Sequence, residues 1–251
     1  MSKPRVGVQL IVFGERVQKD LPGVVKAVGE AGYDGMEIGM PADAQQVERF
    51  RSAVEGTGVA VMGAHSGFAQ WDDPLVVAQR IKAVKALGGR FVITSGRFRS
   101  LEEYRQAARV MNEVGRSCQG EGVVFCYHNH AWEFEVMEDT KPIHLIAGET
   151  DPALVRLCPD VYWVDVGGEQ PAEFISRYQK RCPTSHFKDG LGGEQYAEFR
   201  ELGRGKMDLP AAMKAALACS PEWIVVEQDR SALEAGESCR ISREYLRTLG
   251  V

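Results

Sequence analysis

Eight short apolar runs, separated by stretches with helix-forming patterns, constrain the fold of this chain more than any other feature. Rich in β-branched and aromatic residues, they span residues 5–11, 35–38, 59–64, 91–95, 123–128, 161–166, 184–188 and 223–227. Several of these runs are apolar almost throughout, as expected of parallel strands that are covered on both faces. The pattern therefore predicts eight parallel strands.

The stretches between the runs begin and end as helices do. Asp20 and Asp208 are suitable N-cap residues, and Ser100 with Glu103 forms a capping box. Gly32 stands where a helix would end. Eight strand-plus-helix units in 251 residues leave about 31 residues for each unit, which is the size of a compact βα repeat. We therefore predict an α/β fold, a (β/α)8 TIM barrel, as a single domain over residues 1–251.

An open, doubly wound sheet is the competing architecture. Its dinucleotide fingerprint, GxGxxG directly after the first strand, is absent, because the first run continues into IVFGERV. The closed barrel is the better interpretation.

Composition limits the partners and the compartment. The chain has 30 Lys and Arg against 35 Asp and Glu, a net charge of −5, so it has no uniform basic field for nucleic acid or an anionic membrane. Its six cysteines form no CxxC pair, which favours reduced thiols. We see neither an export signal nor a run of about 18 apolar residues. We expect a cytoplasmic protein.

Polar side chains gather where the predicted strands end. They are Gln9, Glu37, His65, His128, Asn129, His130, Glu133, Asp165, His186, Lys188, Glu227 and Asp229. The C-terminal ends of barrel strands meet on one face, where such barrels carry out chemistry. Mixed oxygen and nitrogen donors suit a divalent ion, and we consider Mn²⁺, Co²⁺, Mg²⁺ and Zn²⁺.

Each of these residues also has a purely structural interpretation. Asp165 could cap the next helix, Glu37 could pair with a neighbouring cation, and His65 and His130 could bond to backbone carbonyls. Glu227 lies in an apolar WIVVEQD run, where an unpaired buried carboxylate would be costly. The set as a whole is stronger evidence for a site than any one member.

Other catalytic templates are missing from the sequence. It contains no GxSxG elbow, no GxxxxGK[ST] loop and no HExxH motif. Two glycine-rich pieces, GLGG at 190–193 and GRG at 203–205, could cradle a phosphate.

A set of motifs gives the chain a resemblance to a known family. In chain order they are GVQL, GYDGMEIG, FCYHNHAWEF, WVDVG, HFKDG, LGRGKMD and VVEQD. Together they resemble the xylose isomerase-like barrel superfamily of sugar isomerases and epimerases, over essentially the whole chain. Within it they resemble the sugar phosphate isomerase/epimerase branch, which neighbours the inosose dehydratases.

The resemblance implies a ligand set for one divalent metal ion. Asp165, His186 and Glu227 match the ligands expected from strands six, seven and eight. On strand five, where many relatives have Glu, this chain has His128, so either His128 or Glu133 is the fourth ligand, and we favour His128. Gly168 also departs from the pattern, since relatives often carry His or an aromatic residue three positions after the Asp.

The implied chemistry is proton transfer next to a carbonyl through a metal-stabilised enediolate. Glu227 is the expected base, and Glu133, His130 or Lys188 the second group. Gln9, Glu37, His65 and Lys188 are expected to contact the substrate, a small sugar or polyol. We predict an isomerase or epimerase. The alternative is a dehydratase or other lyase on a keto-polyol, because a ligated His128 is a poor base.

Two further classes were weighed. A DNA-repair endonuclease occurs on a similar barrel, but its trinuclear zinc site needs more histidines than the five present here. A catalytically silent sugar-binding barrel is the other. The sequence leaves open the sugar, its phosphorylation, the metal and whether the chain forms a homo-oligomer.

Overall fold

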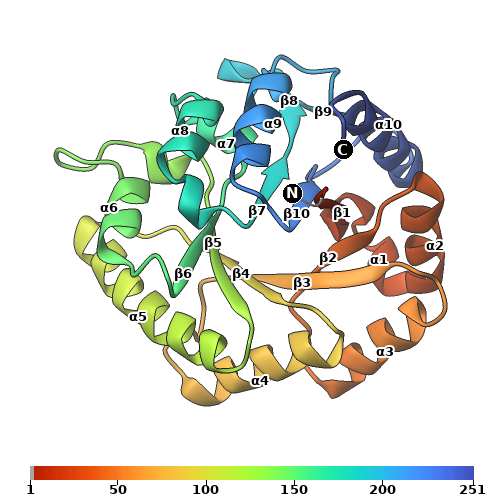
Figure 1. Cartoon of the computed structure of the whole chain (residues 1–251), viewed down its shortest axis with the longest axis horizontal. Coiled ribbons are helices and arrows are strands. Elements are labelled where there is room, and N and C mark those ends of the chain that lie inside the picture. The colour runs from red at the N-terminus through yellow and green to blue at the C-terminus, as the bar shows by residue number, and fades with distance from the viewer. Residues whose placement is uncertain (1–2) are drawn as a thin grey trace.

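The computed structural model describes residues 3–251, with the side chain of Glu194 left out. Within that range an eight-stranded parallel sheet curls into a barrel in the order β6-β5-β4-β3-β2-β1-β10-β7 (Figure 1). Its strands are β1 Arg5–Gln9, β2 Gly35–Gly39, β3 Ala60–Gly67, β4 Phe91–Ser95, β5 Val124–His128, β6 Val155–Cys158, β7 Thr184–Phe187 and β10 Trp223–Val226. The predicted (β/α)8 barrel is confirmed.

The barrel closes between β6 and β7 through a single β-bridge rather than a full ladder. Asp160 and His186 form an isolated parallel bridge, and the His186 N–H donates to the Pro159 carbonyl at 2.8 Å. The seam therefore lies beside two of the polar side chains described below.

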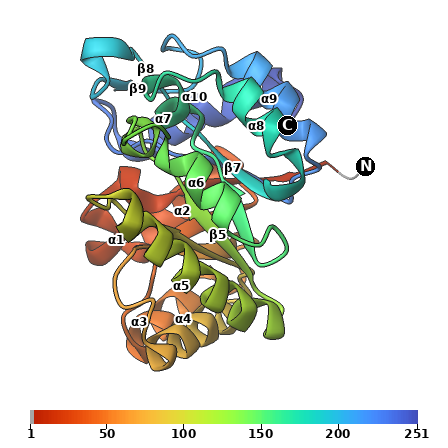
Figure 2. The same cartoon turned by 90° about the vertical axis from the view of Figure 1, so that its left-hand side faces the viewer.

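Helices surround the sheet and connect successive strands (Figures 1 and 2). They are α1 Arg16–Lys19, α2 Leu21–Ala31, α3 Ala44–Val54, α4 Pro74–Ala86, α5 Leu101–Gly120, α6 Pro142–Glu149, α7 Val161–Val166, α8 Pro171–Arg177, α9 Leu209–Ala218 and α10 Ala235–Thr248. Short 3-10 helices are η1 Leu10–Phe13, η2 Trp132–Phe134, η3 Gln179–Arg181 and η4 Gly193–Gln195. A small antiparallel ribbon, β8 Asp189–Gly190 with β9 Phe199–Arg200, follows β7.

The predicted helix starts are confirmed by their hydrogen bonds. The Asp20 carboxylate accepts from the Gly23 N–H at 3.0 Å, and the Ser100 hydroxyl accepts from the Glu103 N–H at 3.2 Å. At the end of α2, Gly32 adopts φ +86°, a left-handed conformation that favours glycine.

One predicted strand is wrong. Residues 161–166 form α7, and the sixth strand is β6, just before them. Asp160 explains the difference, because its Oδ1 accepts from the N–H groups of Tyr162 at 2.9 Å and Trp163 at 3.1 Å and so starts a helix. The chain between β5 and β6 also forms α6.

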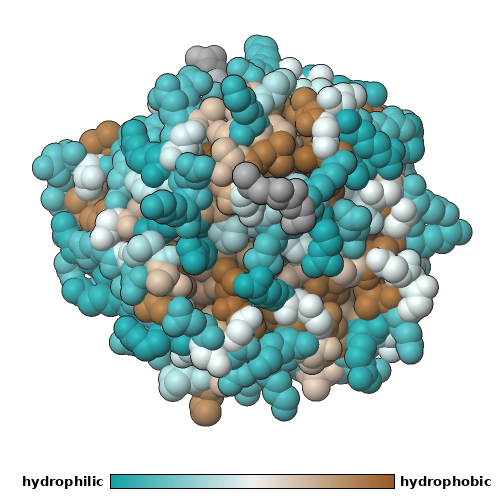
Figure 3. Space-filling view, viewed as in Figure 1, coloured by the Kyte–Doolittle hydropathy of each residue, from teal (hydrophilic) through white to brown (hydrophobic). Residues whose placement is uncertain are grey.

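Below the C-terminal ends of the strands, the interior of the barrel is filled by an apolar cluster, which forms its lower layer. Its buried members are Met62, Phe91, Ile93, Cys126, Cys158, Trp223 and Val225. Most of the other buried apolar residues pack in a second, larger cluster. Hydrophilic side chains dominate the face in Figure 3, with apolar atoms in patches between them. Within residues 3–251, none of the helices is long and apolar enough to cross a bilayer.

Candidate metal centre

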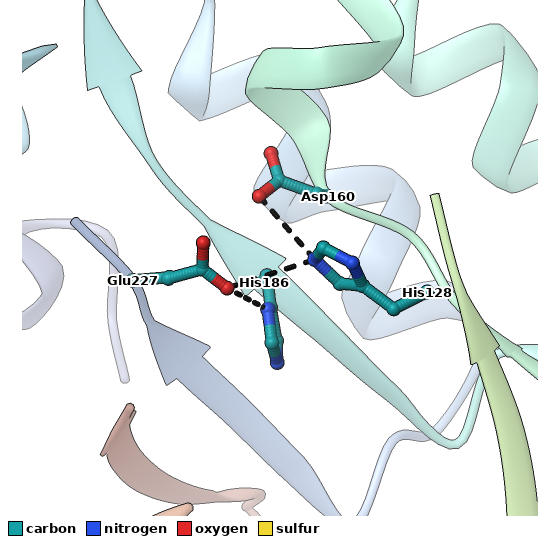
Figure 4. A group of neighbouring side chains, drawn as sticks. All are labelled: His128, Asp160, His186 and Glu227. Carbon is teal, nitrogen blue, oxygen red and sulfur yellow. Dashed lines mark hydrogen bonds and ion pairs between the residues drawn. The ribbon is translucent and has the colours of Figure 1, made fainter. Parts of the chain in front are cut away.

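Four buried side chains converge at the C-terminal end of the barrel. They come from the end of β5, from the residue pair after β6, from β7 and from the residue after β10, and they are His128, Asp160, His186 and Glu227 (Figure 4). One ligand atom from each lies within 4.8 Å of the other three. Two imidazoles and two carboxylates at this spacing match the donor set of a divalent cation.

The two carboxylate oxygens of Asp160 have different roles. Oδ1 caps α7, whereas Oδ2 has no hydrogen-bond partner among the described residues and lies 3.6 Å from His128 Nε2. The carboxyl is fully buried, and burial raises its pKa to about 6 although the nearby Lys188 ammonium lowers it. A buried oxygen without a partner is costly, and a bound cation would remove that cost.

His128 has no hydrogen bond to either ring nitrogen within the described chain. Its Nε2 lies 3.6 Å from Glu227 Oε2 as well as from Asp160. Burial, together with the charge of His186, holds the pKa of His128 well below its usual value. The ring is therefore neutral, which is the form that binds a metal. Unpartnered donor atoms on two of the four residues show that the group fits a metal ion.

His186 is held between two carboxylates. Its Nδ1 lies 2.5 Å from Glu227 Oε2, and its Nε2 lies 2.8 Å from Glu37 Oε2. Burial raises the pKa of Glu37, but the contacts with His186 and His65 outweigh this and leave it at about 2. A carboxylate that binds the far nitrogen of a metal-ligating histidine fixes the ring's orientation and its tautomer. Glu37 is therefore suited to orient His186.

Lys188 is fully enclosed beside Glu227. Its ammonium donates to Glu227 Oε1 at 3.1 Å and pairs with Asp229, and it faces the rings of Trp163 at 4.6 Å and Phe199 at 4.5 Å. Burial lowers the pKa of Lys188, but the carboxylates raise it more, so the amine is charged. For Glu227 burial raises the pKa, and Lys188 and His186 lower it well below its usual value.

His65 lies at the edge of the same group. Its Nδ1 is 3.5 Å from Glu37 Oε1, its Nε2 is 3.1 Å from the Ser95 hydroxyl, and its ring centre is 5.1 Å from that of His128. The side chain is 15% exposed. It is therefore close to the centre and open to a bound molecule.

Glu133 lies outside the group of four. Its Oε1 bonds to the Tyr127 hydroxyl at 2.7 Å, and its Oε2 accepts from the His130 N–H at 2.8 Å. The carboxyl thus braces the turn after β5. Burial raises the pKa of Glu133 to about 8. The His130 ring stacks on Trp132 with centres 4.0 Å apart. Of the two alternatives for a fourth ligand, the geometry favours His128.

One predicted metal ligand lies elsewhere. Asp165, expected as the strand-six ligand, lies on α7 and does not belong to the group, because the strand ends before Asp160. The Gln9 side chain turns back to accept from the Ile11 N–H and caps η1.

Asp160 and Trp163 are the residues that the sequence analysis missed. Counted from Asp160, the residue three positions on is Trp163, an aromatic residue, so the apparent departure at Gly168 came from the wrong reference position. The pair Pro159 and Asp160 after the short run VRLC marks the strand's end, since Pro stops a strand and Asp caps a helix.

The comparison with protein families agrees with the fold. The family model described as "Xylose isomerase-like TIM barrel" matches residues 25–249. The chain belongs to this family.

Curated relatives are inosose dehydratases. One from Lacticaseibacillus casei is 25% identical over 190 residues, which cover 68% of this chain and 63% of the relative. One from Geobacillus kaustophilus is 27% identical over 162 residues, covering 57% and 52%. The matches thus span between about half and two thirds of these relatives' length.

Solved structures share the architecture over nearly the whole chain. A sugar phosphate isomerase/epimerase from Parabacteroides distasonis has a TM-score of 0.80 and 21% identity, covering 98% of this chain and 94% of that one. An IolI protein with a bound zinc atom has a TM-score of 0.78 and 14% identity, covering 98% and 97%. An L-ribulose 3-epimerase has 0.76 and 15%, covering 98% and 94%. Identities this low show the fold alone. The epimerases among the solved structures and the dehydratases among the curated relatives are sugar-modifying enzymes.

Proposed function

We propose that this protein is a divalent-metal-dependent enzyme that moves a proton on the carbon next to the keto group of a sugar or polyol. One observation carries the proposal. Two imidazoles and two carboxylates share a buried site in which His128 and Asp160 keep donor atoms without partners among the described residues. A structural cluster would be expected to pair these atoms.

The roles follow from the contacts. His128, Asp160, His186 and Glu227 would hold the ion, and Glu37 would orient His186. When bound, a divalent ion polarises a carbonyl and offsets the negative charge of an enediolate. His65, beside the group and partly exposed, would contact the substrate.

Glu227 is the proposed base. Lys188 donates to one of its oxygens, and the lowered pKa keeps the carboxylate ionised at neutral pH, the form that a base requires. A single carboxylate can take a proton from one carbon and return it to the neighbouring carbon on the same face. Isomerisation is therefore the reaction that the geometry supports best. Epimerisation needs a base on each face, and His128 replaces the carboxylate expected there.

Dehydration is the second candidate. The same single base would remove the proton, and an acid would protonate the departing hydroxyl so that water leaves. Lys188 is the candidate acid, since Glu133 is bonded to Tyr127 and His130. The inosose dehydratase relatives support this alternative.

Turnover in D₂O separates the two reactions. The purified, manganese-loaded protein would be incubated with a panel of ketoses and keto-polyols, and products would be identified by mass and NMR. Isomerisation gives a product of unchanged formula, which carries deuterium on carbon wherever the proton held by Glu227 exchanges with solvent before it is returned. Dehydration gives a product lighter by one water. Absence of both on the whole panel, with metal bound, would contradict the proposed function.

A further inference from the structure

The segment that follows β7 contains both glycine-rich motifs that the sequence analysis associated with phosphate. Residues 189–207 form the β8–β9 ribbon and then lead into α9. In (β/α)8 enzymes the loops after strands seven and eight frequently bind phosphate. This segment is therefore where a phosphorylated substrate would be expected to bind.

In this chain a protein carboxylate takes the place of the phosphate. Asp189 Oδ2 accepts from the N–H groups of Gly203 at 2.9 Å and Gly205 at 3.0 Å. Asp189 Oδ1 accepts from those of Gly190 at 2.8 Å and Met207 at 3.2 Å. Backbone N–H groups that converge on one anion are the usual structure of a phosphate cradle.

The cradle is closed as well as occupied. Asp189 is 1% exposed, and a Cβ placed on Gly205 would lie 2.0 Å from Asp189 Oδ1 and 2.5 Å from the Gly190 nitrogen. Burial raises the pKa of Asp189, and the four N–H groups act in the opposite direction. The carboxylate thus lies in close contact with the backbone that surrounds it.

Three of the cations in or beside this segment are engaged, whereas Lys206 within it is exposed. Lys188 is paired with Glu227 and Asp229. Arg200 pairs with Glu198 at 3.0 Å, and Arg230 donates to the Ala197 carbonyl at 2.7 Å. A phosphate bound by these three cations would have to displace their partners.

We propose that Asp189 is a built-in occupant of the phosphate cradle, and that the substrate of the metal centre is an unphosphorylated sugar or polyol. The substrate class rests on the proposed function, whereas the occupied cradle does not.

Phosphate rescue tests the cradle directly. Asp189→Ala empties it, so inorganic phosphate should bind there and stabilise the variant. With metal removed, 50 mM phosphate should raise the thermal midpoint of Asp189→Ala by about 3 °C more than that of the wild type at equal ionic strength, as expected for a ligand at roughly ten times its Kd. Asp20→Ala, which removes a carboxylate that accepts a single backbone N–H at the start of α2, is the control and should behave as the wild type.

Equal phosphate shifts in the wild type and Asp189→Ala would overturn the proposal. If Asp189→Ala does not fold, equilibrium dialysis of metal-free wild type against labelled phosphate decides. Absence of saturable binding supports an occupied cradle, and one phosphate bound per chain overturns it.

The substrate class is tested on the manganese-loaded wild type with D-fructose, D-fructose 6-phosphate and inorganic phosphate as probes. The rise in thermal midpoint with D-fructose 6-phosphate should not exceed the larger of the rises produced by D-fructose and by inorganic phosphate. A clearly larger shift would overturn the substrate class. Neither measurement uses turnover, so failure here is distinguishable from failure of the proposed reaction.

Discussion

The two ends of the barrel interior are built on the same strands but have opposite chemistry. On β10 and beyond, Trp223, Val225 and Glu227 face the interior at alternate positions, and on β5 Cys126 is followed two residues later by His128. The lower positions are apolar and closely packed, whereas the upper ones are ionisable and include atoms without partners. Two residues along a strand are only about 7 Å. Along one strand, the packed apolar residues and the ionisable residues of the candidate site are therefore only two positions apart.

This comparison teaches which changes should affect stability and which should affect activity. Substitutions in the lower layer should remove packing and leave the metal centre's ligands in place. Substitutions in the upper layer should impair binding or turnover with little loss of packed area.

The largest effect is expected for Glu227→Gln, which keeps the side chain's size and removes the proposed base. Loss of a positioned general base costs about 10²–10⁴-fold in rate, so kcat on any ketose that the wild type converts should fall by that factor. It should be measured at saturating Mn²⁺, with bound metal determined in parallel. Asp165→Asn, a carboxylate change outside the group, should retain wild-type turnover. Near-wild-type kcat in metal-loaded Glu227→Gln would show that another residue is the base.

In the lower layer, Trp223→Ala should reduce the free energy of unfolding by about 3–5 kcal/mol, because it leaves a cavity where a buried indole packed. Urea denaturation measures this. Leu75→Ala is the matched surface control, since Leu75 is 73% exposed, and it should change stability by less than about 0.5 kcal/mol. If Trp223→Ala weakens metal binding more than it weakens folding, the two layers are not separate.

Metal titration of two variants identifies the fourth ligand in the upper layer. His128→Ala should weaken Mn²⁺ binding by at least about tenfold, as expected for a lost ligand. Glu133→Ala should leave the metal affinity within about twofold, because its carboxyl is bonded to Tyr127 and His130. Isothermal titration of both variants distinguishes them, and the opposite result would assign the position to Glu133.

A pH dependence of stability is also expected from Glu133. Its pKa is raised from 4.5 to about 8, mainly by burial, so the folded state favours the protonated carboxyl. The stabilising contribution is complete below the unfolded pKa and is lost as pH rises through about 8. Glu133→Gln, which is neutral throughout, should lose less thermal stability than the wild type between about pH 6 and pH 9. Parallel stability profiles would contradict a buried, protonated Glu133.

Much of the fold was predictable because apolar runs and helix caps are local features. Seven of the eight predicted runs overlap the barrel strands, and Asp20 and Ser100 cap helices as expected. The prediction of the sixth strand was wrong because VYWVDV consists largely of residues that favour strands, and β-propensity depends strongly on context. The two bonds from Asp160 to the following N–H groups make that run a helix.

The site was predictable in part for the same reason. His128, His186 and Glu227 lie in runs that were assigned correctly, so they reached the group as expected. The prediction of Asp165 as a ligand was wrong because it depended on the misplaced sixth strand. The cradle around Asp189 could not be predicted, because it depends on N–H groups up to 18 residues away that only the folded loop brings together. The extent of the domain and the oligomeric state stay predictions.

The central claim is that Asp160, and not Asp165, completes a metal site with His128, His186 and Glu227. The most direct test is Mn²⁺ titration of Asp160→Asn and Asp165→Asn beside the wild type. Asn can still cap α7, so Asp160→Asn should fold while losing a charged ligand. We predict one Mn²⁺ per wild-type chain, at least about tenfold weaker binding in Asp160→Asn, and unchanged binding in Asp165→Asn. Wild-type affinity in Asp160→Asn, or a loss confined to Asp165→Asn, would contradict the account.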